Sequence, residues 1–377
     1  MPFADIVGHE GPKRVLQRAI VGNRVSHAYL FEGPPLVGKT LTAKTFAKAL
    51  TCEQPPSVGE SCDACPTCLA LERENHPDFL LVRPTSKIEL KDDEGGKETA
   101  EFAGSMINVE AIARLISDAN LRAVRSRRKV FIIASAEAMN PTAANRLLKT
   151  LEEPPGRTTI VLTTANLSAL LPTIVSRCQL VRFGPVPVPE VQAALEKRFP
   201  EIDRGLIRSM AALSGGRFGW AERLLMHPDT IAIRRELLDL TADLPTKPMV
   251  YCLRAAETLV DATERWWLAT SESDQATRAL KEHRDRVLRT KIGDLLDILV
   301  TWFRDLSLAR EEGTGDLLIN ADRTEQLQAA AARVPVSGPS EASAAVRRAR
   351  ESIAGNANLR LTVEVMLAEV WQALQAG

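Results

Sequence analysis

One segment of the chain has the residue types and spacing that hold a polyphosphate. It reads Gly33-Pro34-Pro35-Leu36-Val37-Gly38-Lys39-Thr40 and matches the pattern G-x-x-x-x-G-K-T. In this pattern backbone N–H groups surround the phosphates, the lysine reaches the terminal phosphates and the threonine hydroxyl binds Mg²⁺. A strand is expected before the loop at 28–31, and a helix after it at 40–50 turns its positive end to the loop. We therefore predict a P-loop fold in which four residues bind nucleotide: Gly33, Gly38, Lys39 and Thr40.

The carboxylates that a P-loop ATPase needs are missing from their usual place. Such an enzyme carries acidic residues at the end of a neighbouring strand, where they hold Mg²⁺ and polarise the attacking water. Here the apolar strand expected at 130–133 continues into Ala134 and Ser135. Loss of hydrolysis is therefore the favoured interpretation. Slow hydrolysis through Glu137 or Glu153 stays open as the alternative.

Four of the six cysteines are spaced as metal ligands. Cys62, Cys65 and Cys68 form C-x-x-C-x-x-C, and Cys52 precedes them on the same stretch of chain. Four thiolates make a tetrahedral set that suits Zn²⁺ and leaves no open position for catalysis. We predict a structural zinc site. An iron–sulfur cluster and a metal-free pair of thiols are the alternatives.

The elements that position these residues are expected to alternate between strand and helix as far as residue 183. Further strands are predicted at 79–82 and 160–162, and helices at 15–20, 109–121 and 141–152. These predictions follow from the apolar periodicity of the segments. Such alternation implies a parallel sheet covered on both faces by helices.

Two segments break or close this pattern. The polar stretch 84–105 contains the residues 87–104, which are too polar to pack, and a mobile surface loop is expected there. The prolines at 185, 187 and 189 close the sheet domain, because proline cannot continue a ladder of hydrogen bonds and stiffens a connection.

The rest of the chain is expected to be helical. Three short helices are predicted between residues 191 and 226, and longer helices follow them. Apolar residues keep a 3.6-residue period over 292–306, and the pattern repeats at 359–374. Burial in a core is the favoured interpretation of this stripe and of Trp266-Trp267. A subunit interface is the next alternative.

Length and charge limit what the chain can be. Its 377 residues exceed what one hydrophobic core normally serves, so two or three domains are expected. The 48 basic residues balance 48 acidic ones, which argues against a strongly basic nucleic-acid-binding protein. For the basic cluster at 122–129 a solvated helix end is favoured over a phosphate contact. Neither a membrane-spanning apolar run nor a charged and apolar leader is found, so a soluble, cytoplasmic protein is expected.

Three stretches of the chain resemble one known family. They are NRLLKTLEEPP at 145–155, LPTIVSRC at 171–178, and the four-cysteine insert after the P-loop helix. Together they resemble bacterial clamp-loader subunits of the AAA+ class, and most strongly the delta prime subunits of DNA polymerase III. The resemblance covers most of residues 4–185 and extends more faintly over the helical remainder.

The resemblance implies an α/β domain followed by all-α domains. It predicts an AAA+ RecA-like P-loop domain with a parallel sheet at 1–185, which contains the zinc insert at 52–68. A small helical lid at 186–245 and a C-terminal helical collar for oligomerisation at 246–377 complete the predicted division.

The motif Ser176-Arg177-Cys178 carries the most specific implication of the resemblance. In the family its arginine projects into the nucleotide site of an adjacent subunit, where the guanidinium stabilises charge on the transferring phosphoryl group. The resemblance thus makes Arg177 catalytic in trans and makes the motif part of an interface. An isolated arginine after a strand would more simply form a surface salt bridge.

Two departures distinguish the chain from the motor subunits of this family. The acidic pair is replaced by Ala134-Ser135, and the lid arginine that senses the γ-phosphate is absent, with Arg217 at a different offset. A shift of one residue aligns Thr164 with the family's other polar sensor. Delta prime subunits are regarded as stators that tolerate a degraded nucleotide site, so these losses fit. The intact Lys39-Thr40 leaves binding of ATP or ADP with Mg²⁺ open.

The function implied by the resemblance is that of a non-motor subunit of the replicative clamp loader. It would join gamma or tau and delta subunits in a hetero-oligomer that loads the sliding clamp on primed DNA. DNA polymerase activity would belong to the holoenzyme, and ATPase activity of this chain would be weak or absent. Any DNA contact would be made through phosphates. The rival interpretations are an ATP-hydrolysing gamma or tau subunit and a zinc-containing nucleic-acid-binding adaptor.

Overall fold

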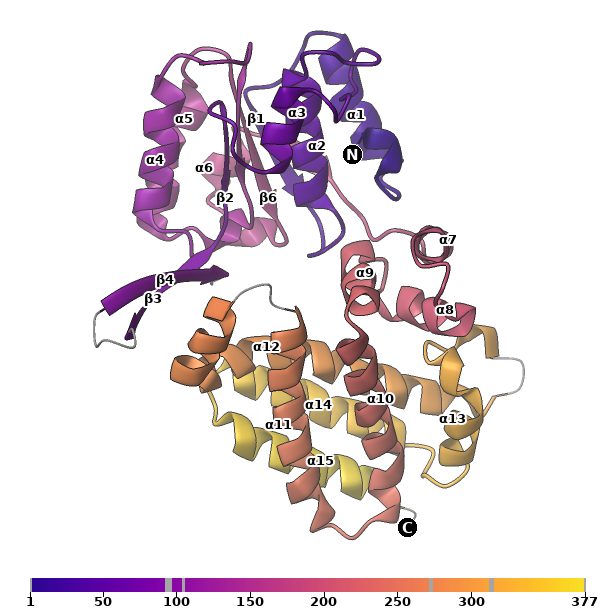
Figure 1. Cartoon of the computed structure of the whole chain (residues 1–377). Coiled ribbons are helices and arrows are strands. Elements are labelled where there is room, and N and C mark those ends of the chain that lie inside the picture. Colours follow the sequence, from indigo (N-terminus) through magenta and orange to yellow (C-terminus); the bar gives the residue numbers. More distant parts are fainter. Residues whose placement is uncertain (1, 92–96, 104–105, 271–273, 312–314, 376–377) are drawn as a thin grey trace. The chain divides into compact units, whose positions relative to one another are not determined.

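A five-stranded parallel sheet forms the centre of the N-terminal part of the chain (Figure 1). The computed structural model describes residues 2–91, 97–103, 106–270, 274–311 and 315–375. The strand order is β2-β5-β6-β1-β7. The five strands are β1 (Ala28–Glu32), β2 (Phe79–Val82), β5 (Lys129–Ile133), β6 (Thr158–Thr164) and β7 (Gln179–Arg182).

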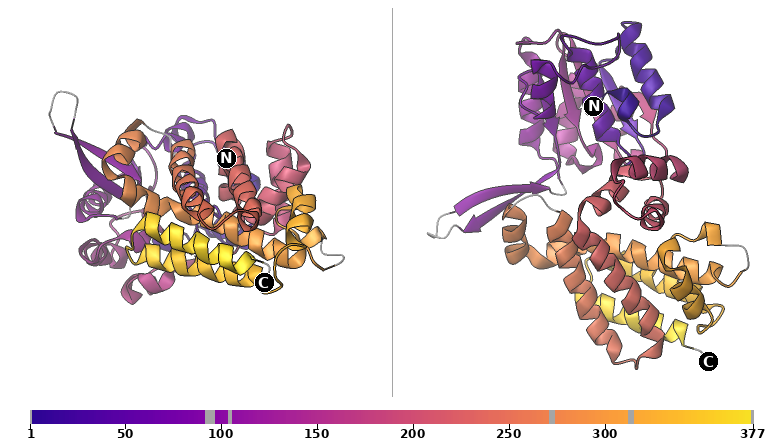
Figure 2. Two further views of the ribbon diagram at one scale, coloured as in Figure 1. Left: turned by 90° about the horizontal axis from the view of Figure 1, so that it is seen from below. Right: turned by 45° about the vertical axis from the view of Figure 1, so that its right-hand side comes forward.

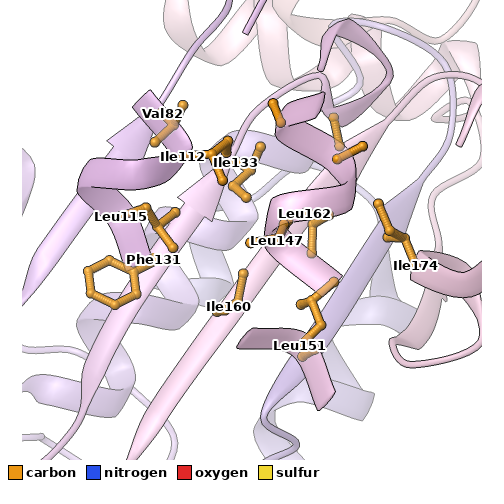
Figure 3. Packing of buried hydrophobic residues seen from close by; sticks show 14 of the residues in the cluster. Val82, Ile112, Leu115, Phe131, Ile133, Leu147, Leu151, Ile160, Leu162 and Ile174 are labelled. Carbon is orange, nitrogen blue, oxygen red and sulfur yellow. The ribbon is translucent and has the colours of Figure 1, made fainter. Parts of the chain in front are cut away.

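Helices cover both faces of this sheet, as the alternating pattern predicted (Figure 1). Successive strand residues point to opposite faces, so Leu30 enters one core while Tyr29 and Phe31 enter the other. The first core, drawn in Figure 3, lies under α4 (Val109–Asn120), α5 (Pro141–Glu152) and α6 (Pro172–Val175). The second lies under α1 (Glu10–Val21), α2 (Lys39–Thr51) and α3 (Pro66–Glu72).

The four strands predicted from apolar runs are confirmed, whereas strand β7 was missed. Along β7 only Val181 is buried, and Gln179 and Arg182 are exposed. Among the described strands β7 pairs with β1 alone, so it lies at the edge of the sheet. A short strand at this position needs to bury side chains on one face only. An edge strand of four residues has too little apolar pattern to be recognised.

The prediction of a loop over residues 87–104 was wrong. Strand β3 (Thr85–Lys91) and strand β4 (Lys97–Ala103) pair there as a two-stranded sheet. Residues 92–96 and 104–105, which the predicted loop also included, lie outside the described residues. The polarity of the stretch concealed an alternation of Ile88 and Leu90 with charged neighbours, which is the period of a strand.

The remainder of the described chain is helical. Its helices are α7 (Val188–Arg198), α8 (Arg204–Leu213), α9 (Phe218–Met226), α10 (Pro228–Asp243), α11 (Tyr251–Thr270), α12 (Asp274–Leu308), α13 (Thr324–Ala331), α14 (Gly338–Ala354) and α15 (Leu359–Leu374). Helices α14 and α15 pack along each other, as both views in Figure 2 show. None of the helices described is long and apolar enough to cross a membrane.

The apolar stripe predicted on α12 is buried, as is the tryptophan pair of α11. Within 292–306 every apolar member of the stripe is at most 2% exposed, and Trp266 and Trp267 are buried as well. The core interpretation of both features is therefore confirmed for this chain.

Contacts within the chain group the described residues into two units. The first contains 1–89, 99–191 and 216–219, and the second contains 90–98, 192–215 and 220–377. The grouping places the predicted lid residues 192–215 in the same unit as the predicted collar. The division into three domains at 185 and 245 stays a prediction.

A buried polar network joins helices on both sides of residue 245 within the second unit. Arg234 of α10 donates from Nη1 to Asp322 Oδ2 at 2.7 Å and from Nη2 to Asn320 Oδ1 at 2.7 Å. Asp305 of α12 accepts from the backbone N–H of Asn320 at 2.7 Å, and Ser209 of α8 donates to Asp322 Oδ1 at 2.8 Å. Burial opposes the charge of Asp322, but the hydrogen bonds from Arg234 outweigh it and lower the pKa of Asp322. These hydrogen bonds therefore hold together helices α8, α10 and α12 and the segment 320–322.

Truncating Arg234 is expected to destabilise the helical unit. The side chain is 3% exposed, so Arg234→Ala removes the guanidinium that pairs with Asp322 and Asn320, at a cost of about 3 kcal/mol in the free energy of unfolding. Urea unfolding followed by circular dichroism measures this. Arg235→Ala, which removes the exposed neighbouring arginine, is the matched control. Equal midpoints for the two variants would show that the network contributes nothing.

Candidate functional site

The loop 33–40 has the strained conformation that a P-loop requires. It connects β1 to α2, and Gly33, Leu36 and Gly38 all have positive φ angles, of 153°, 60° and 108°. A Cβ atom at position 33 would lie 2.0 Å from the carbonyl oxygen of Phe183, so only glycine fits there. Leu36 adopts the left-handed region without being glycine, a conformation that costs about 1 kcal/mol.

Lys39 is turned back onto the loop. Its Nζ donates to the carbonyl oxygens of Gly33 at 2.5 Å and Pro34 at 2.6 Å. Burial lowers the pKa of Lys39, and the negative charges of Glu137 and Glu32 partly oppose this shift. The ammonium group is therefore held at the loop by two backbone oxygens. A phosphate that binds Lys39 has to compete with these two acceptors.

Two hydrogen bonds to backbone carbonyl oxygens fix the loop in place. His9 donates from Nε2 to the carbonyl oxygen of Val37 at 2.7 Å, and burial lowers the pKa of His9, which favours the neutral ring. The N–H of Gly219 donates to the carbonyl oxygen of Leu36 at 3.1 Å, so segment 216–219 is held against the loop. Arg217 belongs to this segment and therefore lies near the loop. Its position in the sequence had argued against the role of the lid arginine.

The predicted polar sensor Thr164 ends strand β6, beside β1. Its carbonyl oxygen accepts from the N–H of Gly33 at 3.1 Å. Its hydroxyl donates to the carbonyl oxygen of Asn166 at 3.1 Å and accepts from the N–H of Asn166 at 3.0 Å. The side chain is therefore engaged in a turn, and a sensor role for it stays a prediction.

The end of strand β5 carries no acidic residue. Ala134 and Ser135 follow the strand directly, and the N–H of Ser135 donates to Thr163 Oγ1 at 3.1 Å. The nearby acid is Glu137, whose Oε1 accepts from the N–H of Ala165 at 3.1 Å. Its Oε2 is buried without a hydrogen-bond partner among the described residues. Glu137 is thus the carboxylate whose charge acts most strongly on Lys39.

The four predicted metal ligands come together, as expected from their spacing. The sulfur atoms of Cys52, Cys62, Cys65 and Cys68 all lie within 4.8 Å of one another. Cys52 caps the end of α2, and Cys65 caps the start of α3. Between them Asp63 has a positive φ angle of 53°, which makes the tight turn after Cys62. None of the six cysteines forms a disulfide bond.

Hydrogen bonds and burial favour a bound cation at this cluster. The N–H groups of Ala64 and Cys65 point at the Cys62 sulfur and lower the pKa of that thiol to about 6. Burial instead raises the pKa of Cys52 and of Cys68, so four thiolates cannot coexist there without a positive charge. A tetrahedral site with Zn–S bonds of about 2.3 Å places its sulfur atoms about 3.8 Å apart. The distance between the Cys52 and Cys62 sulfur atoms is 3.5 Å, so the donor set fits such an ion.

A buried lysine fastens the cysteine module to the P-loop helix. Lys48 of α2 contacts Asp63 at 2.7 Å and Glu72 at 2.8 Å with a side chain that is 3% exposed. Burial would lower the pKa of Lys48, but the hydrogen bonds to both acids outweigh it and raise that pKa. Leu71 of α3 adds an apolar contact in the core that α2 also covers. The module is therefore part of the P-loop domain's packing.

Arg177 lies in the turn between α6 and β7, so it precedes a strand instead of following one. The guanidinium donates from Nη1 to the carbonyl oxygen of Thr173 at 2.9 Å, and from Nη2 to Glu152 Oε1. Its side chain is 33% exposed. Cys178, the next residue of the predicted motif, packs against the first core, and burial raises the pKa of its thiol to about 12. The motif therefore has an inward cysteine and an arginine that reaches the surface.

Sequence reasoning missed three residues that hold these sites. Lys48, Glu152 and His9 each fix a residue of the P-loop, the cysteine module or the arginine motif through a contact between distant parts of the chain. No local pattern marks such partners. Only the apolar surroundings of Lys48, between Ala47 and Ala49 on a helix, hint at burial.

The parallel sheet and the glycine-containing loop between β1 and α2 define a P-loop fold. Residues 8–187 match the family described as "DNA polymerase III, delta subunit". This part of the chain is similar to that family, in agreement with the resemblance seen in the sequence.

Individual relatives agree with this assignment. The DNA polymerase III subunit delta' of Pseudomonas aeruginosa is 36% identical over 202 residues, which are 53% of this chain and 56% of the relative. The subunit delta' of Bacillus subtilis is 36% identical over 190 residues, 50% of each chain. The subunit tau of Bacillus subtilis is 29% identical over 240 residues, 63% of this chain and 39% of the relative. The chain thus spans about half the length of the curated relatives it matches.

Proposed function

We propose that the protein is a non-motor subunit of the replicative DNA polymerase III clamp loader. The observation that carries the proposal is the end of strand β5, where Ala134 and Ser135 stand in a domain of the delta-subunit family. A chain without acidic residues there keeps the P-loop fold but loses the groups that bind Mg²⁺ and activate water. Such a subunit contributes to the ring by structure and by contacts with its neighbours.

The proposed contribution to a neighbouring subunit is Arg177. The side chain reaches the surface, and its planar guanidinium is suited to stabilise charge on a transferring phosphoryl group. The partners would be gamma or tau and delta subunits, and through the assembled complex the sliding clamp and primed DNA. Ser176 and Cys178 would belong to the same interface. A cytoplasmic location follows from this role.

The metal at the cysteine cluster is proposed to be a structural Zn²⁺. Cys52, Cys62, Cys65 and Cys68 would hold it as four thiolates in a closed set, which leaves no position for a substrate. When bound, the ion supplies the charge that the crowded sulfur atoms need. It thereby stabilises the module that Lys48 joins to the P-loop helix.

We also propose that the P-loop binds ATP or ADP for structural reasons. Gly33, Gly38, Lys39 and Thr40 are in the right order on the β1–α2 connection, and Lys39 would exchange two carbonyl oxygens for phosphate. Titration of the isolated chain with ATP and Mg²⁺ is expected to show saturable binding by calorimetry. Lys39→Ala is the control. No heat change at millimolar nucleotide would contradict the proposal.

The proposed function is tested by assembly and by the turnover of the isolated chain. The tagged protein is expected to co-purify with the loader subunits of its own cell, and the pure chain is expected to release no phosphate above a blank. Glu137 decides the remaining alternative, because it has an unpaired buried oxygen and acts on Lys39. If slow turnover is found, Glu137→Gln is expected to abolish it. Brisk turnover that survives this substitution would refute the non-motor role.

The similarity to a tau subunit supports the alternative that this chain is an ATP-hydrolysing gamma or tau subunit. That interpretation requires a carboxylate able to activate water, and the same turnover assay separates the two roles. The adaptor interpretation requires the lone chain to bind DNA with strong salt dependence. Its balanced charge gives no support to this.

A further inference from the structure

We propose that Glu152 is a positioning residue for Arg177 and holds its guanidinium in one orientation at the surface. This inference rests on the proposed role of Arg177 in trans and adds a second residue to it. Glu152 ends helix α5, and Arg177 follows helix α6. The two residues are brought together by the packing of these helices and not by their order in the chain.

The guanidinium of Arg177 is held at both of its terminal nitrogens. Nη2 donates to Glu152 Oε1. Nη1 donates to the carbonyl oxygen of Thr173 at 2.9 Å and lies 3.4 Å from the hydroxyl of Ser176. A planar group that is held at two points on two elements cannot rotate about its last bonds. Its orientation is therefore set by the carboxylate and the helix carbonyl together.

Both holding points are anchored in one core. Helix α5 places Leu147 and Leu151 in the first core of the sheet domain, and α6 places Ile174 there (Figure 3). All three side chains are fully buried. The frame that carries Glu152 and Thr173 is therefore rigid, whereas the long arginine side chain alone is not.

This arrangement leaves donors for an outside anion. A guanidinium has five N–H groups, and the contacts to Glu152, Thr173 and Ser176 use at most three of them. Among the described residues no acceptor takes the remaining N–H groups on Nε and Nη2. The free N–H groups of the Arg177 guanidinium can therefore bind a phosphate, while Glu152 and Thr173 hold its other N–H groups. Freezing the side chain in advance removes an entropy cost that would otherwise be incurred when the phosphate binds.

The alternative is that this contact is an ordinary exposed ion pair. Such a pair contributes little to stability, and its carboxylate would lower the attraction of Arg177 for an anion. The two interpretations predict opposite changes when the carboxylate is removed. Loss of positioning slows the neighbouring site, whereas loss of a competing charge leaves its turnover unchanged or raises it.

The test is a double-mutant cycle in the reconstituted clamp loader. ATP turnover is measured with the clamp and primed DNA for the wild type, Glu152→Ala, Arg177→Ala and the double variant. We expect Glu152→Ala to lower kcat at the neighbouring site about three- to tenfold with KM unchanged, with a smaller fall for the whole complex, and to have no further effect in the Arg177→Ala background. Glu152→Gln, which keeps an acceptor oxygen, is expected to fall between. Glu110→Ala, which removes an exposed acid from α4, is the control.

Each other outcome refutes part of the scheme. Unchanged or raised turnover in Glu152→Ala refutes the positioning role while Arg177 keeps its own. An equal loss in both backgrounds shows that Glu152 acts independently of Arg177 and also refutes it. Unchanged turnover in Arg177→Ala refutes the trans role itself, and the inference falls with it. On the isolated chain, NMR relaxation of the Arg177 Nε–H group is expected to show greater mobility in Glu152→Ala.

Discussion

Arg177→Ala is expected to depress ATP turnover at the neighbouring site of an assembled loader by about a thousandfold. An arginine supplied from another subunit contributes about 10³–10⁵ to kcat in phosphoryl transfer, and no other residue of this chain is proposed to replace it. Turnover of the whole complex falls less, because other sites keep their own arginines. Phosphate release with the clamp and primed DNA present measures the effect.

The folding of the Arg177→Ala variant is expected to be nearly unaffected. The side chain is partly exposed, and its contacts with Glu152 and Thr173 lie at the surface. Their loss costs about 1 kcal/mol or less in the free energy of unfolding. Arg177→Lys keeps the charge but loses the planar fork, so it is expected to recover only part of the activity. A loader that assembles with Arg177→Ala and keeps full turnover would exclude the proposed role.

Cys68→Ser is expected to abolish metal binding and to unfold the module between Cys52 and Glu72. The variant removes a buried ligand from a closed set of four. Metal binding and folding are coupled in such sites, where the ion contributes about 10–16 kcal/mol in small isolated domains. Here Leu71 is the module's buried member of a sheet-domain core, so a loss of several kcal/mol that falls mainly on the module is expected.

Metal analysis and limited proteolysis test the metal prediction. The wild type is expected to contain about one zinc per chain, and Cys68→Ser is expected to contain none and to be cleaved within residues 53–67. Cys252→Ala changes a buried cysteine outside the cluster and should retain the metal. An iron–sulfur absorption band in the wild type would overturn the assignment to zinc. A metal-free wild type that resists proteolysis would show that the module folds without an ion.

The fold could be predicted where one segment contains the whole signal. The continuous apolar runs 28–31 and 130–133 lie within strands β1 and β5, and helix α5 begins at a proline and ends at the predicted residue. The misses have different causes. The edge strand β7 buries one side chain, and β3 and β4 have an alternation masked by charge. Helix α10, which was not predicted as a separate element, buries one face, but Thr230, Arg234 and Thr241 lie on that face and interrupt its apolar stripe.

The candidate sites divide in the same way. The P-loop and the cysteine cluster are short motifs, and their members come together as their spacing requires. The partners that hold them are distant in sequence, such as Glu152 for Arg177 and Asp322 for Arg234. Their pairing is set by how helices pack, and a single sequence contains no record of it. The backbone conformation of the loop could not be predicted either, because no local sequence pattern indicates that Leu36 has a left-handed backbone.

The lack of space at Gly33 has a consequence for how two nucleotide sites communicate. The loop begins against the backbone of Phe183, and strand β7 runs from there back toward Arg177 beside β1. A nucleotide that displaces the start of the loop must therefore push Phe183 or separate β7 from β1, the strand with which it pairs among the described residues. Either movement reaches the turn that carries the arginine offered to the next subunit. If the chain binds nucleotide and supplies Arg177 to its neighbour as proposed, occupancy of its own loop is expected to be transmitted along this edge of the sheet.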